Sequence, residues 1–212
     1  MKLAAVATAA GVAFALGRLT SRSEVVAARR EANTDALTGL TNRAGLMHQL
    51  HNRTRKGLPY AVFLFDLNGF KPVNDRHGHR TGDELLAALG DRLRADFPEQ
   101  VTARLGGDEF VVVLDGAYPY EVLETFGARV IRTVERPVRL TGVPEPVKIS
   151  AAIGIAVSRP SESPRCTLHA ADQAMYRSKI LGAPYAQKVR TRGRLDESPK
   201  VRLRDRRRVR VA

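Results

Sequence analysis

The chain has 212 residues, of which 43% are apolar; this is enough for one domain with a hydrophobic core and excludes a collagenous, coiled-coil or fully disordered protein. Its single cysteine, Cys166, can form neither an internal disulfide nor a cysteine metal cage, which indicates a reducing compartment. The net charge of +13 divides into +3 for residues 1–34, +8 for residues 186–212 and +2 for residues 35–185, so the central part lacks the basic surface that is typical of nucleic-acid binding.

Residues 1–20 are predicted to form an apolar helix. The uncharged run at 3–17 would measure ~22 Å as a helix, short of the ~30 Å hydrocarbon core of a bilayer unless Leu19 and Thr20 extend it. We expect residues 3–20 to anchor the protein in the cell membrane; a packing helix and a signal peptide are the alternatives. Three basic residues follow the run and favour a cytoplasmic position for what comes after it: Arg22, Arg29 and Arg30. Residues 21–34 are expected to form a short linker helix.

The central part, residues 35–185, alternates between short apolar runs and longer segments with helical periodicity. The predicted elements in chain order are a helix over 42–54, a buried strand Tyr60–Phe65, a helix Asp83–Phe97, a hairpin of strands 101–105 and 110–114, a helix Tyr120–Val134, a strand Val147–Val157 and a helix Leu168–Leu181. This order predicts an α+β fold: one domain with a central, mainly antiparallel sheet flanked by helices.

Residues 186–212 carry eleven Lys or Arg against three Asp or Glu, without apolar periodicity. Such a composition is typical of a disordered basic tail. We expect the tail to be solvated. Attraction of the basic ends to an anionic membrane is the alternative, and binding of nucleic acid is the reading that the sequence favours least.

Carboxylates occur where the predicted strands end. Asp66 closes the strand that begins at Tyr60, and Asp108 and Glu109 lie at the hairpin turn. If the two strands pair, Asp66 and Asp108 come within a few ångströms of each other, where they repel unless a cation lies between them. Oxygen ligands without cysteine suit Mg²⁺ or Mn²⁺. The alternative is that these turn carboxylates only face solvent.

Five motifs in this order resemble those of the GGDEF family of diguanylate cyclases. They are "DALTGLTNR" (35–43), "FDLNGFKPVNDRHGHRTGDELL" (65–86), "RLGGDEF" (104–110), "ISAAIGIA" (149–156) and "ADQAMYRSK" (171–179). The resemblance covers about residues 35 to 185 and implies a single GGDEF domain.

This resemblance implies an enzyme that condenses two GTP into cyclic di-GMP and releases two pyrophosphates, with one GTP held by each domain of a homodimer. It implies two Mg²⁺ or Mn²⁺ ions per active site, held by Asp66, Asp108 and the Leu67 carbonyl, with Asp108 or Glu109 accepting the proton of the attacking hydroxyl. Gly106 and Gly107 form the signature loop. Because GTP is cytosolic, the resemblance places the catalytic domain in the cytoplasm and argues against a signal peptide.

The family pattern also implies substrate contacts. Asn74 and Asp83 correspond to the pair that reads guanine. From the residues alone, Asp83 is favoured as a cap of the helix that starts there, and the two roles do not exclude each other. The implied phosphate contacts are Asn68, Gly69, Phe70, Lys71 and Lys179. His77 and His79 match a structural element of the family, so we expect loop hydrogen bonds from them rather than metal ligation.

Three positions depart from the family pattern. Asn68 stands where an aspartate is common, which should leave the metal site intact. Ala183 stands where the family often has a phosphate-binding arginine, which predicts weaker GTP binding. Residues 97–100, "FPEQ", replace the inhibitory Arg-x-x-Asp, so we expect no product inhibition through that site.

Two other functions compete with the cyclase. A GGDEF-like domain could hold GTP and signal to a partner without turnover, which the residue at Ala183 and the lack of a sensory domain before residue 35 would favour. Alternatively, the basic tail could be the functional part, carried by a nucleotide-gated domain. The acidic and glycine positions of the motifs favour the cyclase.

Overall fold

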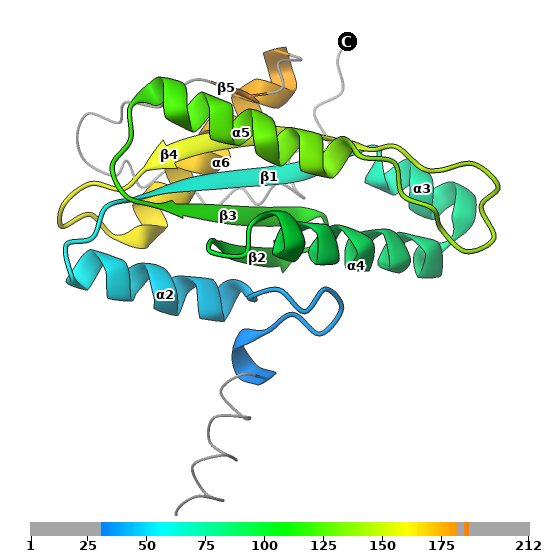
Figure 1. The fold of residues 1–212 in the computed structure, drawn as a ribbon, viewed down its shortest axis with the longest axis horizontal. Coiled ribbons are helices and arrows are strands. Elements are labelled where there is room, and N and C mark those ends of the chain that lie inside the picture. The colour runs from blue at the N-terminus through cyan, green and yellow to red at the C-terminus, as the bar shows by residue number, and fades with distance from the viewer. Residues whose placement is uncertain (1–30, 182–184, 187–212) are drawn as a thin grey trace, which may run out of the picture.

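The computed structural model describes residues 31–181 and 185–186 (Figure 1). The expected membrane anchor at 3–20, most of the linker helix and the basic tail after Ala186 lie outside the described residues. None of the helices in the described ranges is long and apolar enough to cross a bilayer.

A five-stranded sheet forms the centre of the domain, in the order β2-β3-β1-β4-β5. Its strands are β1 (Tyr60–Asn68), β2 (Val101–Gly106), β3 (Glu109–Asp115), β4 (Ser150–Val157) and β5 (Tyr185–Ala186). β1 pairs antiparallel with both β3 and β4, and only the short β5 runs parallel to its neighbour. The prediction of a mainly antiparallel sheet flanked by helices is confirmed.

Helices cover both faces of the sheet (Figure 1). They are α2 (Arg43–Arg55), α3 (Phe70–His77), α4 (His79–Asp96), α5 (Tyr120–Glu135) and α6 (Pro164–Leu181). On one face, Phe63 and Phe65 of β1 join a cluster with α4 and α5. On the other, Val62 and Leu64 join a cluster with α2 and α6. Because side chains alternate along a strand, this double burial explains the unbroken apolar run in β1.

The alternation also decides which face Asp66 joins. Asp66 has the same parity as Val62 and Leu64, so its side chain lies on the face covered by α6, close to the end of β1. The strand that gives the sheet its core therefore also delivers one carboxylate to the α6 side.

Two boundaries near the site differ from the sequence-based expectation. Residues 70–77, expected to be a polar segment, form helix α3. It has no fully buried residue, and only Phe70 and Val73 pack against the core, which is too short an apolar pattern to reveal a helix. Helix α4 begins at His79, and its N-cap is Gly78 with φ 86°. Asp83 lies in the second turn, so the alternative that it caps this helix is wrong.

Helix α6 rests on β4 at a point where no side chain intervenes. A Cβ built on Gly154 would lie 1.9 Å from the Ala171 carbonyl oxygen and 2.3 Å from the Met175 nitrogen. Both are backbone atoms and cannot turn aside. The glycine therefore sets the distance between α6 and the sheet.

We predict that Gly154→Ala destabilises the protein by about 1–3 kcal/mol, because an added methyl must push α6 off the sheet. Chemical denaturation monitored by circular dichroism measures the change. Gly127→Ala is the control, since its Cβ would meet only side-chain atoms, the tip of Ile155 at 3.3 Å and the Phe63 ring at 3.7 Å. Equal stability of the Gly154 variant and the wild type would contradict the close contact.

Candidate active site

Three carboxylates lie where β1 and β3 pair. Asp66 is 7% exposed and stands opposite Glu109 in the register of the two strands. The next residue, Leu67, donates its N–H to the Asp108 carbonyl oxygen at 3.2 Å. The pairing thus brings Asp66, Asp108 and Glu109 to one end of the sheet, as the hairpin pattern predicts.

Lys179 is the cation that neutralises Asp66. Its Nζ lies 2.6 Å from Asp66 Oδ1, and its side chain is 29% exposed. Lys179 projects from α6, on the face of the sheet to which Asp66 points. The resemblance implies that this lysine contacts a phosphate. In the structure its partner is Asp66, the carboxylate expected to bind metal.

The surroundings of Glu109 disfavour the ionised form of its carboxyl group. Burial raises the pKa of the Glu109 carboxyl above its usual value, and the charges of Asp66, Asp172 and Asp108 raise it further, while Arg43 opposes the shift. The Arg43 guanidinium lies 3.5 Å from Glu109 and is 60% exposed, so its attraction is weakened by solvent. A further cation near these acids would relieve the repulsion.

The donor set suits a hard divalent cation. Within residues 31–181 and 185–186, no three His, Cys, Asp or Glu side chains gather closely enough to hold an ion by themselves. Mg²⁺ is commonly bound through one or two carboxylates and completed by water and substrate phosphates. Asp66 and Asp108, with Glu109 beside them, fit an ion of that kind.

The signature loop connects β2 to β3 through two glycines in the left-handed region. Gly106 has φ 137° and Gly107 has φ 57°, conformations that other residues rarely adopt. No atom lies within 4 Å of a Cβ built on either glycine. The backbone, rather than crowding by neighbours, requires glycine here, and the open space leaves the loop accessible to a ligand.

An ion pair ties this loop to the turn before α2. Arg104 donates through Nε to the Gly107 carbonyl oxygen at 3.0 Å and through a terminal nitrogen to Asp35 at 3.1 and 3.2 Å. Thr38 donates both its N–H and its hydroxyl to the same carboxylate. Burial alone would raise the pKa of Asp35, but the bonds from Thr38 and Arg104 outweigh it and lower that pKa.

The residues expected to read guanine lie at the corner between α3 and α4. Asn74 Oδ1 is buried, and no hydrogen-bond partner for it exists among the described residues. A Cβ on Gly82 would lie 1.8 Å from that oxygen, so only glycine allows Asn74 to sit against α4. Asp83, the next residue, is exposed. The structure brings Asn74 and Asp83 to one corner but records no contact between their side chains.

The expected phosphate contacts surround the junction of β1 and α3. Gly69 is the N-cap of α3 with φ 85° and provides no side-chain cap, so the first N–H groups of the helix remain available to an anion. Asn68 donates to Ser150 Oγ at 3.2 Å, and Lys71 pairs with Asp75 at 2.5 Å. Phe70 is half-buried against the core. Lys71 therefore lies at this junction but is engaged within α3.

His77 and His79 end α3 and begin α4, on either side of Gly78. They belong to helix ends rather than to the loop expected from the sequence. Among the described residues, neither histidine belongs to a group of side chains that could hold a metal ion.

Sequence reasoning missed three residues of this region: Arg43, Gly82 and Asp172. All three fall inside the motifs at 35–43, 65–86 and 171–179, which was the available signal. Their roles depend on contacts between distant segments, which the spacing of a motif does not show.

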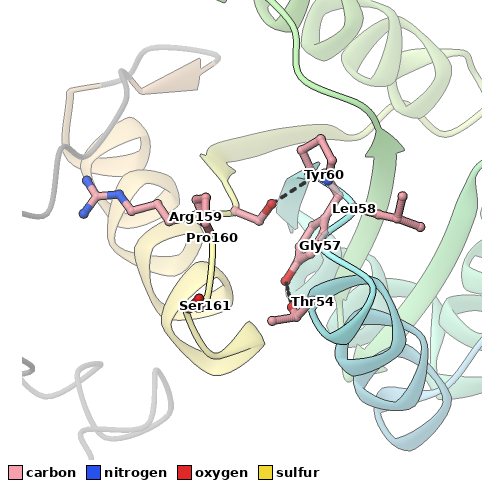
Figure 2. A pocket seen from close by; sticks show the side chains of 9 residues that line it. Thr54, Gly57, Leu58, Tyr60, Arg159, Pro160 and Ser161 are labelled. Carbon is pink, nitrogen blue, oxygen red and sulfur yellow. Dashed lines mark hydrogen bonds between the residues drawn. The ribbon is translucent and has the colours of Figure 1, made fainter.

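A shallow hollow of about 50 Å³ lies elsewhere, between the end of α2 and the segment after β4 (Figure 2). Tyr60 lines it and donates its N–H to Ser158 Oγ at 2.9 Å. Tyr60 begins β1, whereas Asp66 lies near the other end of that strand. The Arg159 side chain points away from the hollow in Figure 2. The hollow is therefore separate from the carboxylates, and no charged side chain among the described residues that line it points into it.

The comparisons with known proteins agree with this geometry. A family model described as "Diguanylate cyclase, GGDEF domain" matches residues 32–183. The bifunctional diguanylate cyclase/cyclic di-GMP phosphodiesterase MucR of Pseudomonas aeruginosa is 37% identical over 195 residues, which cover 85% of this chain and 28% of MucR. The diguanylate cyclase DosC of Escherichia coli is 33% identical over 162 residues, 73% of this chain and 34% of DosC.

Among solved structures, the coiled coil and GGDEF domain of DgcB from Caulobacter crescentus, in complex with c-di-GMP, matches with a TM-score of 0.71 and 27% identity, covering 86% of this chain and 98% of that one. The matched region amounts to between 21% and 35% of the length of the first curated relatives. The shared part is one domain of those longer proteins.

We predict that Glu109→Gln raises the unfolding temperature of the metal-free protein at pH 7 by about 2–4 °C. A carboxyl whose folded pKa lies above the usual 4.5 costs the folded state stability as the pH rises through that range, and glutamine carries no charge. Thermal unfolding with a chelator at pH 7 and pH 4 tests this, and the gain should vanish at pH 4. Glu99→Gln, at an exposed position, is the control. A lower unfolding temperature at pH 7 would contradict the prediction.

Proposed function

The chain belongs to the GGDEF domain family, and from that membership we propose that it is a diguanylate cyclase, which condenses two GTP into cyclic di-GMP and releases two pyrophosphates. The observation that carries the proposal is the placement of Asp66 opposite Glu109 and beside Asp108, with Lys179 Nζ 2.6 Å from Asp66. Carboxylates and a lysine at one point are the groups that nucleotidyl transfer requires.

In this proposal Asp66, Asp108 and the Leu67 carbonyl hold two Mg²⁺ or Mn²⁺ ions, which acidify the attacking 3′-hydroxyl and neutralise the phosphates when bound. Asp108 or Glu109 accepts the proton of that hydroxyl. A raised pKa, such as that of Glu109, suits a general base that works near neutral pH. Lys179 provides positive charge beside the triphosphate.

Substrate binding uses the junction of β1 and α3 and the corner of α3 and α4. The free N–H groups at the start of α3 face the phosphates, together with Lys71 once it leaves Asp75. Asn74 and Asp83 accept hydrogen bonds from the guanine edge. Adenine lacks those donors and would leave the carboxylate unpaired, which supports discrimination on the order of 10⁴.

The reaction needs two GTP, so each protomer of a homodimer is proposed to hold one. We also propose that residues 3–20 anchor the chain in the cell membrane with the GGDEF domain, residues 35–185, on the cytoplasmic side, followed by a basic tail. The composition of the ends supports this arrangement.

We predict that Asp108→Ala abolishes synthesis of cyclic di-GMP and leaves the fold intact, because this side chain lies in a polar turn outside the core. Mass spectrometry of the product from GTP and Mg²⁺, alongside a circular dichroism spectrum, measures both. Glu99→Ala, which removes an exposed carboxylate outside the proposed site, is the control and should keep activity. Turnover by the Asp108 variant would refute the metal assignment. GTP binding by the wild type without turnover, even after fusion to a dimerising domain, would favour a GTP-binding signalling module.

We predict that Asp83→Ala raises the GTP concentration needed for half-maximal rate and weakens the preference for GTP over ATP. The cause is loss of the acceptor for the guanine N–H donors. Steady-state rates and competition by ATP measure the two effects. A variant that still discriminates like the wild type would exclude Asp83 from base reading.

A further inference from the structure

One carboxylate ties the loop between α5 and β4 to helix α4. Glu84 accepts hydrogen bonds from the Thr141 N–H at 3.0 and 3.1 Å, one to each oxygen, and from the Thr141 hydroxyl at 2.9 Å. Figure 1 shows this loop running past α3 to the N-terminal end of α4. Glu84 directly follows Asp83, so the loop is attached next to the residue proposed to read guanine.

The loop, residues 136–149, is held by its own hydrogen bonds and by buried side chains. Val138 and Val147 pair through two backbone hydrogen bonds of 2.8 Å, and Val143 donates to Leu140 at 3.2 Å across the tip. Val138 and Leu140 are buried in the same hydrophobic cluster as Leu85 of α4. Because its base and one side are anchored, the loop can hold Glu84 in place rather than follow it.

The corner between α3 and α4 needs such support. Gly78, with φ 86°, is the only residue between the two helices, and neither helix has a side-chain N-cap. The apolar residues that α4 adds to the core begin at Leu85, about two turns after the corner. Two polar side-chain links hold the first turns of α4. Thr81 donates its hydroxyl to the His77 carbonyl oxygen at 2.9 Å within the corner, and the bonds between Glu84 and Thr141 join α4 to the loop before β4.

We propose that Glu84 is a positioning residue for base recognition. Consecutive residues of a helix point about 100° apart, so fixing the Glu84 side chain fixes the rotation of the turn that carries Asp83. The same turn holds Gly82 against Asn74. This inference rests on the proposed function, because only in that function do Asp83 and Asn74 read guanine.

The test measures binding of unreactive GTP and ATP analogues to the full chain by calorimetry. Glu84→Gln should weaken the GTP analogue about tenfold, since it removes the charge and at least one of the three bonds. The ATP analogue should bind as before, so the preference for guanine falls by the same factor. Glu145→Gln removes an equal charge from the same loop at an exposed site that has no recorded partner in residues 31–181, and should change neither affinity.

A second substitution guards against a folding defect. Thr141→Val keeps the main-chain bonds and loses the hydroxyl, and it should weaken the GTP analogue about two- to threefold. In the Glu84→Gln background it should add nothing, because both changes break one link. Circular dichroism and the unfolding temperature verify that each variant is folded.

The outcomes separate the two proposals. Undiminished preference for guanine in folded Glu84→Gln, or equal weakening of both analogues, would overturn the positioning role. A wild-type chain that fails to distinguish the two analogues would instead overturn the proposed function, and the positioning role with it. A selective loss in Glu84→Gln, with a smaller loss in Thr141→Val and none in Glu145→Gln, establishes the role.

Discussion

The ion pair between Lys179 and Asp66 balances a carboxylate that the fold removes almost completely from water. β1 is covered by helices on both faces, and Asp66 near its end is only 7% exposed. A carboxylate removed from water to that extent either binds a proton or requires a partner. α6 supplies the partner, with Nζ 2.6 Å away. The position of α6, set by its backbone contact at Gly154, is therefore a condition for placing the charge there at all.

Two other groups of the site, Glu109 and Asn74, are less well balanced by the residues around them. The charges of Asp66, Asp172 and Asp108 raise the pKa of Glu109, and the solvent-exposed Arg43 opposes them only in part. Asn74 Oδ1 is buried without a recorded partner. Each of these costs stability, and each would be relieved by a cation or a hydrogen-bond donor. Such local costs are typical of sites organised for a ligand rather than for maximum stability.

The sequence predicts most of the sheet and its acidic end. The unbroken apolar run from Tyr60 and the two strands around Gly106 and Gly107 suffice to place Asp66 near Asp108, because antiparallel pairing leaves few registers. α3 is not predictable from periodicity, since it is eight residues long and buries none of them. The start of α4 is missed because Gly78 provides no side-chain cap.

The contacts that the sequence does not predict are those between segments far apart in the chain. The bond from Lys179 to Asp66, the bonds from Arg104 to Asp35 and those from Thr141 to Glu84 each connect residues 57 or more positions apart in the chain. Local patterns carry no information on such contacts, and only the packing of the sheet reveals them. The anchor at 3–20 and the basic tail stay predictions from composition.

The contact at Gly154 also limits how α6 and its Lys179 side chain can move. With backbone atoms of α6 against β4, the helix cannot slide along the sheet without separating from it. Any exchange of the Lys179 ammonium between Asp66 and another anion must then occur by rotation about its side-chain bonds, on a timescale of picoseconds to nanoseconds for a partly exposed lysine. The exchange of this lysine between anions therefore requires no movement of α6 or of the sheet.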